Sequence, residues 1–465
     1  MNWKTSLNPI LISGAEVLPI VEGGKGIAVS DGVSSGAWAA EDGIGTFSAV
    51  NPHIPGAKEL SLIESYSSKI RIKRHAEMIE RAILGGIAQA KIAYETARNR
   101  GRIHMNVMWE MSGVDVILNG ILSKVKGLIH GVTCGAGMPF RLAEICAKYN
   151  TKYYPIVSSA RAFSILWKRA YNRFAEWLGG VVYEDPWIAG GHNGLSTQEN
   201  EAIRELPEPR VLSLRNTMRE FGLDDSVPIF VAGGVWCLRE FTDWINNPDF
   251  GAIAFQFGTR PLLTKESPIP LSWKKSLLTL KRGDISLNRF SPTGFPSSAV
   301  NNSFLQDLQN RSARQVVFSM DSNNIYTEVF CIPREVFVRQ NDIPDIQKWI
   351  REGFSVPLIT PSQTLVFVTP EQNRAIELDR SKCIGCISSC RFSGWTQDQN
   401  AQPPIPDPRL FCIQKSLQHI VINGDVNNAL MFCGHQGYRF AEDPFYDNGF
   451  IPTVKELFER ICSGQ

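Results

Sequence analysis

Long apolar runs are missing from this 465-residue sequence, and with them any segment of about 20 residues that could cross a membrane as a helix. The first residues, MNWKTSLNPILISGAEVLP, also lack a sustained apolar core followed by a small-residue cleavage site, so no secretory signal is expected. Both absences argue against a membrane protein and against a secreted protein. We therefore expect a cytoplasmic chain.

An excess of charge of either sign is missing too. The chain has 48 Lys and Arg against 46 Asp and Glu, a formal net charge of +2, and no basic block interleaved with aromatic residues. Proteins that follow a phosphate backbone usually have such a block, so nucleic acid is not an expected partner. The 43% hydrophobic content and 20% charge are typical of a globular protein, which at this length should form one large domain and a smaller one.

Eight short apolar segments alternate with longer segments of helical period between residue 16 and about residue 265. Most are continuous apolar runs, as expected of parallel strands buried on both faces, and they end in glycine or polar residues. The segments are VLPIVEGG, GIGTFSAV, IHMNVMWE, GLIHGVTCGAG, YYPIVSSA, GGVVYED, VPIFVAGGV and GAIAFQFGT. Eight such units in about 250 residues predict an α/β fold, the (β/α)8 TIM barrel, with a doubly wound open sheet as the alternative.

We expect the barrel to occupy residues 1–283. From about residue 285 the alternation stops, and segments such as SPTGFPSSAVNNS and NAQPPIPDPRL bring proline, serine and asparagine. This change predicts a second, smaller region of irregular α+β structure over residues 284–465. Within the barrel, the aromatic-rich stretch SARAFSILWKRAYNRFAEWLGG predicts an amphipathic helix that packs on the barrel or on a second subunit of a homo-oligomer.

Glycines at the ends of the seventh and eighth segments predict a phosphate site. VAGGVW places Gly233 and Gly234 after the seventh segment, and QFGTR places Gly258 and Thr259 after the eighth. In barrels these two strand ends often bind phosphate, because glycines let backbone N–H groups approach an anion closely. A pair of tight turns is the alternative interpretation.

One of the seven histidines, His192, stands in the glycine-rich segment WIAGGHNGLS. The segment follows the sixth predicted strand, and barrel enzymes place catalytic groups at such strand ends. Gly190 and Gly191 have no side chains, so a large flat group can lie against their backbone. An imidazole with an ordinary pKa of about 6.5 takes or gives a proton near neutral pH, whereas the alternative is a histidine hydrogen-bonded within a turn.

Taken in chain order, these motifs resemble the nitronate monooxygenases, also called 2-nitropropane dioxygenases, and the related FMN-dependent enoyl-acyl-carrier-protein reductases. The resemblance covers about residues 10–268, and SPTGFPSS extends it. It rests on Gly23 and Gly24 after the first strand, GIGTFSA at the second, Asn106 at the third, AGGHNG at the sixth, VAGGV at the seventh and QFGTRPLLTKES at the eighth.

The resemblance implies an FMN-binding barrel that acts as a flavin-dependent oxidoreductase on a small molecule, a nitronate or a related substrate, with O2 as electron acceptor. His192 would be the catalytic acid or base, next to flavin N5. The implied FMN-binding residues are Gly23, Gly24, Asn106, Gly190, Gly191, Gly233, Gly234, Gln256, Gly258 and Thr259.

Two other functions stay open. The same scaffold suits an NAD(P)H-dependent enoyl-thioester reductase of lipid or polyketide metabolism, in which electrons flow to the substrate. No G-x-G-x-x-G motif precedes a predicted helix, so NAD(P)H would bind transiently over the flavin. The alternative from another class is a barrel that binds a phosphorylated metabolite without redox chemistry.

Ten cysteines in a chain without a secretory signal indicate thiols or metal ligands rather than a disulfide framework. RSKCIGCISSCRFSGW places Cys383, Cys386 and Cys390 in a C-x2-C-x3-C array, and thiolates so close in sequence can converge on one metal centre. We expect a [4Fe-4S] cluster whose fourth ligand is Cys412 or Cys433. The alternatives are zinc, with His435 as a further ligand, and unliganded thiols.

Overall fold

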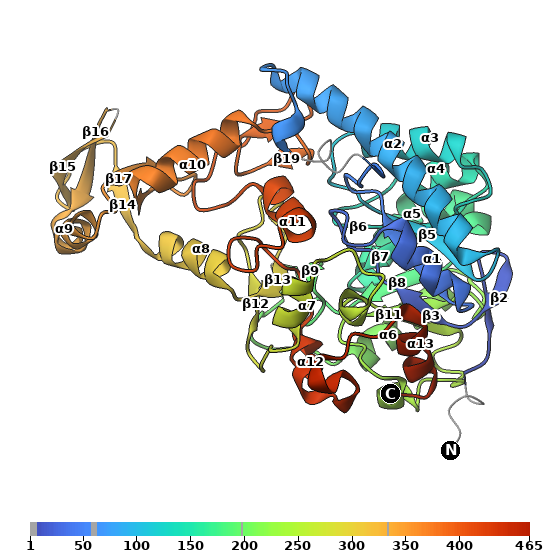
Figure 1. Ribbon diagram of the computed structural model, residues 1–465. Coiled ribbons are helices and arrows are strands. Elements are labelled where there is room, and N and C mark those ends of the chain that lie inside the picture. The colour runs from blue at the N-terminus through green and yellow to red at the C-terminus, as the bar shows by residue number, and fades with distance from the viewer. Residues whose placement is uncertain (1–6, 57–62, 197–198, 333) are drawn as a thin grey trace.

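The computed structural model describes residues 7–56, 63–196, 199–332 and 334–465. Within these residues, eight parallel strands close into a barrel in the order β10-β11-β3-β4-β5-β6-β7-β8 (Figure 1). They are β3 (Ile20–Glu22), β4 (Ile44–Ser48), β5 (Arg102–Met108), β6 (Gly131–Gly135), β7 (Lys152–Val157), β8 (Val181–Glu184), β10 (Ile229–Ala232) and β11 (Ile253–Phe257). The TIM barrel is confirmed, and the open sheet is wrong because β11 pairs with β3, with Phe255 opposite Ile20.

Helices cover the outside of the barrel. They are α1 (Gly32–Ala40), α2 (Arg71–Ala97), α3 (Val114–Lys124), α4 (Leu142–Lys148), α5 (Ala160–Arg169) and α6 (Pro207–Glu220), with the short 3-10 helices η3 (Ile63–Ser65), η4 (Tyr171–Trp177), η5 (Leu238–Phe241) and η6 (Arg260–Leu263). The aromatic-rich stretch forms α5 and η4, which pack on the barrel through Phe163, Trp167 and Tyr171. In the described part of the chain, every helix is too short or too polar to traverse a bilayer.

A hairpin of β1 (Ile10–Ile12) and β2 (Ala15–Val17) closes the amino-terminal end of the barrel. Ile12 and Val17 pack inside this end against Tyr154 and Phe230. At the turn of the hairpin, the Ser13 hydroxyl lies 2.6 Å from the Tyr154 hydroxyl. Because side chains fill this end, a ligand site has to be built at the carboxyl ends of the strands, where barrel enzymes place it.

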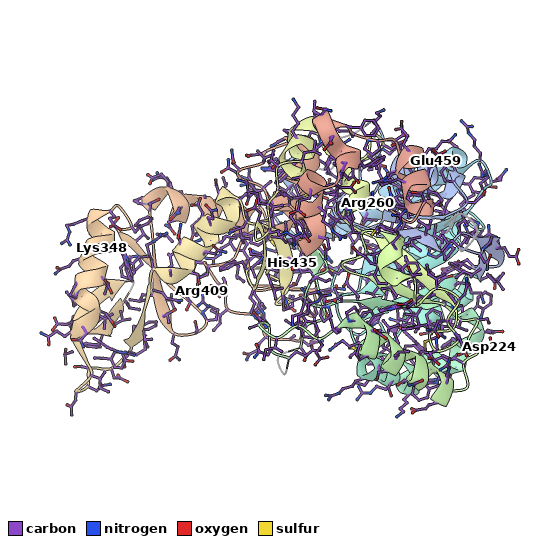
Figure 2. All side chains as sticks on the ribbon, turned by 90° about the horizontal axis from the view of Figure 1, so that it is seen from below. Asp224, Arg260, Lys348, Arg409, His435 and Glu459 are labelled. Atoms are coloured by element: carbon purple, nitrogen blue, oxygen red, sulfur yellow. The ribbon has the colours of Figure 1, made fainter. Side chains whose placement is uncertain are left out.

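The second region contains a small antiparallel lobe that stands away from the barrel, with α8 and α10 leading to and from it (Figure 1). Its sheet has the order β15-β16-β14-β18-β17. The elements are α8 (Ser303–Ala313), β14 (Gln315–Ser319), β15 (Tyr326–Ile332), β16 (Arg334–Arg339), η7 (Gln340–Asp342), α9 (Ile343–Arg351), β17 (Val356–Ile359), β18 (Thr364–Val368) and α10 (Pro370–Ser381). The expected α+β structure is confirmed, and the sheet is regular rather than irregular. Figure 2 shows Lys348 far out in this lobe and Arg409 at its junction with the rest of the molecule.

The other elements of the second region lie against the barrel. They are α7 (Leu271–Leu277), β12 (Ile285–Asn288), β13 (Ser297–Val300), β19 (Ser389–Cys390), β20 (Trp395–Thr396), α11 (Ile413–Ile422), η8 (His435–Tyr438), α12 (Arg439–Glu442), η9 (Pro444–Gly449) and α13 (Val454–Cys462). Helix α13 buries Val454, Leu457, Phe458 and Ile461 in the same core as the barrel helices. Helix α13, near the end of the chain, therefore contributes to the packing of the barrel. The domain division between residues 283 and 284 stays a prediction.

The packing of α13 can be tested at Phe458, whose ring centroid lies 5.6 Å from that of Trp38 in an edge-on contact. We expect Phe458→Ala to lower the free energy of unfolding by about 3–5 kcal/mol, because a buried aromatic ring is replaced by a cavity. The matched control is Glu459→Ala at the exposed neighbouring position, which should change it by less than about 0.5 kcal/mol. Denaturant unfolding measures both, and equal effects would contradict the packing of α13.

Candidate functional site

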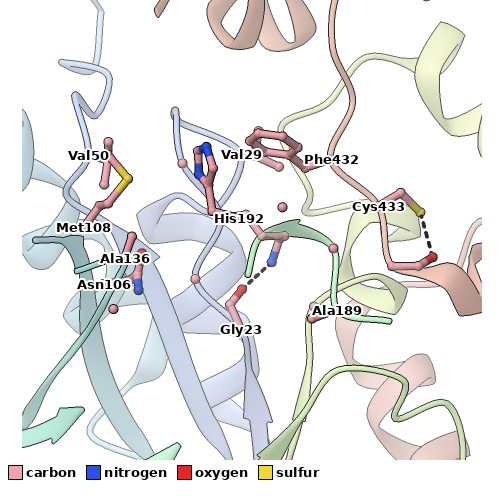
Figure 3. A pocket seen from close by; sticks show the side chains of 18 of the residues that line it. Gly23, Val29, Val50, Asn106, Met108, Ala136, Ala189, His192, Phe432 and Cys433 are labelled. Atoms are coloured by element: carbon pink, nitrogen blue, oxygen red, sulfur yellow. Dashed lines mark hydrogen bonds between the residues drawn. The ribbon is translucent and has the colours of Figure 1, made fainter. Parts of the chain in front are cut away.

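A pocket opens at the carboxyl ends of the barrel strands (Figure 3). It brings together His192 and the residues that the sequence suggested for FMN. These are Gly23, Gly24, Asn106, Gly190, Gly191, Gly233, Gly234, Gln256, Gly258 and Thr259, and every one of them lines the pocket. The strand register explains this convergence, because Ala232 of β10 stands opposite both Gln256 of β11 and Glu184 of β8.

Glycines have no side chain, and in this pocket they let two walls approach each other and leave space for a ligand. A Cβ at Gly24 would lie 2.3 Å from the Cβ of Asn106, so the loop after β3 can contact β5 only as glycine. A Cβ at Gly258 would meet no atom within 4 Å, which means that this backbone faces the open pocket. The first glycine thus serves packing, and the second leaves room for a ligand.

Gly233 and Gly234 form the turn after β10. Their φ angles of +84° and +77° lie in the left-handed region, which side chains other than glycine rarely adopt. Nearby, the Thr259 hydroxyl oxygen accepts a hydrogen bond of 3.0 Å from the backbone N–H of Gly434. The hydroxyl keeps its proton, so Thr259 can still donate to an anion at this edge of the pocket.

His192 lies in β9 (Gly191–His192), which pairs with β13 so that His192 stands opposite Ser297. The second region therefore fixes the Gly-Gly-His segment. The imidazole Nε2 lies 2.7 Å from the Ser291 hydroxyl, and the ring packs edge-on against Phe432 at 5.2 Å between centroids. Among the described residues Nδ1 has no hydrogen-bond partner, so this nitrogen is available for proton exchange with a bound substrate.

The protonation of His192 differs from the expectation drawn from the sequence. Burial lowers its pKa from 6.5 to about 4, because the imidazolium loses solvation in this pocket. The imidazole is therefore neutral over the physiological range, with a lone pair that can accept a proton, and the same desolvation makes it a weaker base than a solvated histidine. Figure 3 shows it beside Phe432, with Asn106 and Met108 of β5 on the opposite side of the pocket.

Two ionisable residues of the pocket were not among the site residues expected from the sequence. Glu184, the last residue of β8, lines the pocket, and burial with the neighbouring Asp185 raises its pKa to about 8. Lys25 donates a hydrogen bond of 2.7 Å to the Gly23 carbonyl and contacts Glu22 at 3.2 Å. The sequence signal for both was available, because a carboxylate ends the apolar run VVYE and a lysine interrupts the glycines of VEGGKG.

The second region supplies a wall of the pocket that the sequence did not reveal. Gln414 and Leu417 come from α11, and Phe432 and Cys433 come from the segment before η8. All four lie more than 200 residues after His192 in the chain, and no local pattern relates them to it. Their position depends on how the second region folds back over the barrel.

The five cysteines considered as metal ligands lie in two neighbouring apolar clusters. Cys383, Cys386, Cys390 and Cys412 pack in one, Cys433 packs in the other beside Thr259, and Cys386 contacts both. His435, the additional zinc ligand considered above, lies 3.1 Å from the Ser298 hydroxyl through Nε2.

Burial raises the pKa of the Cys386 thiol, and the neighbouring Cys412, Cys390 and Cys383 add to the shift. In the described part of the chain, however, no three His, Cys, Asp or Glu side chains stand in an arrangement that could hold a metal ion. The side-chain positions thus give the expected metal centre no support, and it stays a prediction.

Comparison with known proteins agrees with the barrel and its motifs. Residues 130–355 match the family model for nitronate monooxygenase. No curated protein matches the chain. In structure the chain is similar to FabK from Thermotoga maritima, with 16% identity, 95% of this chain and 91% of that chain covered, and a TM-score of 0.50, a likeness that supports the fold.

Weaker likenesses are found with nitroalkane oxidase from Streptomyces ansochromogenes (18% identity, 66% of this chain and 80% of that chain, TM-score 0.41). The enoyl reductase domain of MlnA from Bacillus amyloliquefaciens is also similar (12% identity, 96% of this chain and 93% of that chain, TM-score 0.48). The family match over residues 130–355 agrees with the resemblance found in the sequence and indicates a flavin-dependent oxidoreductase.

Proposed function

We propose that this protein is an FMN-dependent oxidoreductase that oxidises a nitronate, or a related small carbon acid from which His192 removes a proton. The observation that carries the proposal is the convergence on one pocket of three glycine loops, after β3, β10 and β11, and of the Gly-Gly-His segment. The glycine turns suit a phosphate, because their backbone can approach an anion closely. Gly191 leaves room for a flat ring, whereas a Cβ at Gly190 would lie 2.5 Å from the Gly434 backbone nitrogen, so this glycine serves close packing instead.

The residues present fit FMN. Gly258 leaves space beside Thr259 where the phosphate would lie, and the Thr259 hydroxyl supplies a donor. Asn106 and Gln256 place amide groups at the pocket walls, where a flavin ring offers acceptors and donors. When bound, FMN would supply a two-electron acceptor at this position.

Three residues of the chain have separate roles in this reaction. Neutral His192 takes a proton from the carbon next to the nitro group through Nδ1, while the Ser291 hydroxyl holds Nε2 and so fixes the ring. The apolar ring of Phe432 packs edge-on against the imidazole and limits access of water. A substrate that is already an anion needs no base, and for it His192 has a positioning role.

Enoyl-thioester reduction by NAD(P)H is a second candidate, and one observation favours it. Glu184 in the pocket has a pKa of about 8 and is therefore a neutral acid at pH 7, and enoyl reduction needs such an acid to protonate the α carbon. Anaerobic mixing separates the two functions. A nitronate or nitroalkane reduces bound FMN in the first, whereas NAD(P)H reduces it and an enoyl thioester reoxidises it in the second. A protein purified without flavin would favour the metabolite-binding barrel.

The phosphate assignment is best tested at Gly258, because Gly234 has a positive φ and a Cβ there would lie 2.2 Å from Ile188. Gly258→Asp adds a carboxylate where nothing obstructs it. At about 4 Å from a phosphate, like charges cost on the order of 4 kcal/mol, so we expect FMN affinity to fall about 10³-fold. Gly258→Asn is the matched neutral control and should retain most of the affinity. Flavin fluorescence titration measures both, and equal losses would place the phosphate elsewhere.

His192→Asn tests the base. The variant should retain FMN, while anaerobic reduction of the flavin by a neutral nitroalkane slows by roughly 10²- to 10⁴-fold. Reduction by the corresponding nitronate should slow much less, because that substrate has already lost its proton. In wild type, the rate with nitroalkane should fall only as the pH approaches the His192 pKa of about 4. Ser291→Ala, which keeps the imidazole, should show a smaller loss. Equal rates for His192→Asn and wild type would rule out the acid–base role.

The protonation of Glu184 can be measured through stability. Its pKa of about 8 in the fold exceeds the ordinary value of 4.5, so folding favours the protonated form. This contribution is complete below 4.5 and is lost as the pH rises through 8. Glu184→Gln should therefore match wild type near pH 4.5 and unfold at a higher temperature near pH 8. Glu220→Gln, at an exposed position, is the control. Parallel pH profiles for Glu184→Gln and wild type would show that the carboxyl is ionised at neutral pH.

A further inference from the structure

Lys25 and Glu22 form a buried ion pair at the pocket that has no part in the chemistry described above. Glu22 is the last residue of β3, and Lys25 follows the two glycines that come after it. Lys25 Nζ lies 3.2 Å from Glu22 Oε1. The Glu22 side chain is only 1% exposed, whereas the Lys25 side chain is 16% exposed and lines the pocket. The cation of the pair therefore faces the pocket, and the carboxylate is enclosed by protein.

The loop that carries Lys25 is closed on itself and tied to α1. The Ser30 backbone N–H donates to the Lys25 carbonyl at 2.9 Å, and the Lys25 backbone N–H donates to Ser30 Oγ at 3.1 Å. The Asp31 carboxylate then caps α1 by accepting a hydrogen bond of 2.9 Å from the Ser34 backbone N–H. These bonds fix the backbone of Lys25, so its side chain starts from a defined point at the edge of the pocket.

The pairing of Glu22 with Lys25 leaves hydrogen-bonding capacity on both sides. Glu22 Oε1 also accepts a hydrogen bond of 3.0 Å from the Ser34 hydroxyl, and Oε2 has no hydrogen-bond partner among the described residues. Lys25 Nζ donates a second hydrogen bond, of 2.7 Å, to the Gly23 carbonyl. An ammonium has three N–H groups, and within the described part of the chain Lys25 Nζ has these two acceptors. One N–H is therefore left for a ligand.

The Lys25 ammonium is the source of positive charge at the pocket. In the described ranges of the chain, no other Lys or Arg side chain lines it. His192 and Glu184 are uncharged near neutral pH, because burial lowers the pKa of the first to about 4 and raises that of the second to about 8. Figure 3 shows Gly23, whose carbonyl the ammonium contacts, among the labelled residues of the pocket. An anion that enters the pocket therefore meets one cation there.

Burial couples the charge of Lys25 to what occupies the pocket. It lowers the pKa of the Lys25 ammonium, and Glu22 opposes this shift. A second anion in contact with the ammonium would oppose it further, so the two charges would stabilise each other. Ile27 and Val29 line the pocket close to Lys25 in the chain, and charges attract each other more strongly in apolar surroundings than in water.

We propose that Lys25 determines the specificity of the pocket for an anionic substrate, by donating its remaining N–H to an oxygen of a small planar oxyanion. The inference rests on the proposed function, in which a nitronate is bound directly or is formed when His192 removes a proton from a nitroalkane. Glu22 competes with the bound anion for the same ammonium, so it limits the affinity. The two residues of the pair therefore have opposite effects on anion binding.

The test is calorimetric titration of the purified full chain with propionate and with propionamide. Propionate has the planar group and the single charge of a nitronate but no nitro group, and propionamide is its neutral match. Wild type should bind propionate more tightly than propionamide. Glu22→Gln should raise the affinity for propionate, because the competing carboxylate is gone.

Lys25→Met is made together with Glu22→Gln, because alone it would leave a buried carboxylate without its partner and could unfold the chain. Relative to Glu22→Gln, the double variant should bind propionate about 10- to 100-fold more weakly, the range for one hydrogen bond between charged groups. The affinity for propionamide should change little. Lys91→Met, at an exposed position on α2, is the matched control and should bind both probes as wild type does.

Three outcomes would overturn the proposal. They are equal affinities of wild type for the two probes, an undiminished preference for propionate in the double variant, and weaker propionate binding in Glu22→Gln. FMN content is measured on the same samples, so the two proposals can fail separately. Propionate binding that depends on Lys25 in a protein without flavin keeps the anion site and contradicts the oxidoreductase. A flavin that nitroalkane reduces, with propionate binding independent of Lys25, keeps the oxidoreductase and rejects the role of Lys25.

Discussion

The pairing of β11 with β3 is the contact on which the pocket depends. It joins strands more than 200 residues apart in the chain, and the ladder ends where the Gly23 backbone N–H donates to the Phe257 carbonyl at 2.8 Å. This bond places Gly23 beside Gly258, so the glycine loops of the first and last strands face each other. Without closure the glycines would be separate turns of an open sheet. Closure places them side by side at one edge of the pocket.

Burial at this end of the barrel determines the protonation states of the pocket residues. The same loss of solvation keeps His192 in its uncharged form and Glu184 in its protonated form, because both ionised forms are penalised. Lys25 and Glu22 are paired with each other, which offsets part of the cost of burying them. The pocket thus presents one neutral imidazole and one protonated carboxyl group.

Much of the fold and of the candidate site could be predicted from the sequence. The eight strands are continuous apolar runs, and the polar or glycine residues that end them converge because parallel strands share one carboxyl edge. This rule predicts from the sequence that Asn106, Gln256 and Gly258 lie close together. It could not supply Phe432 or Ser291, whose positions follow from the pairing of β13 with β9 and from long-range packing. Nor could it give the pKa of His192, since burial is a property of the assembled pocket.

The second region forms part of the site itself. It fixes His192 through β13 and Ser291, packs Phe432 edge-on against the imidazole, and brings Cys386 to the pocket wall. The barrel alone would lack Ser291 and Phe432, the side chains that contact the imidazole of His192. The second region supplies both and also lines the pocket with residues of α11 and of the segment before η8. The burial that lowers the pKa of His192 therefore arises where the two regions meet, between residues that are distant in sequence.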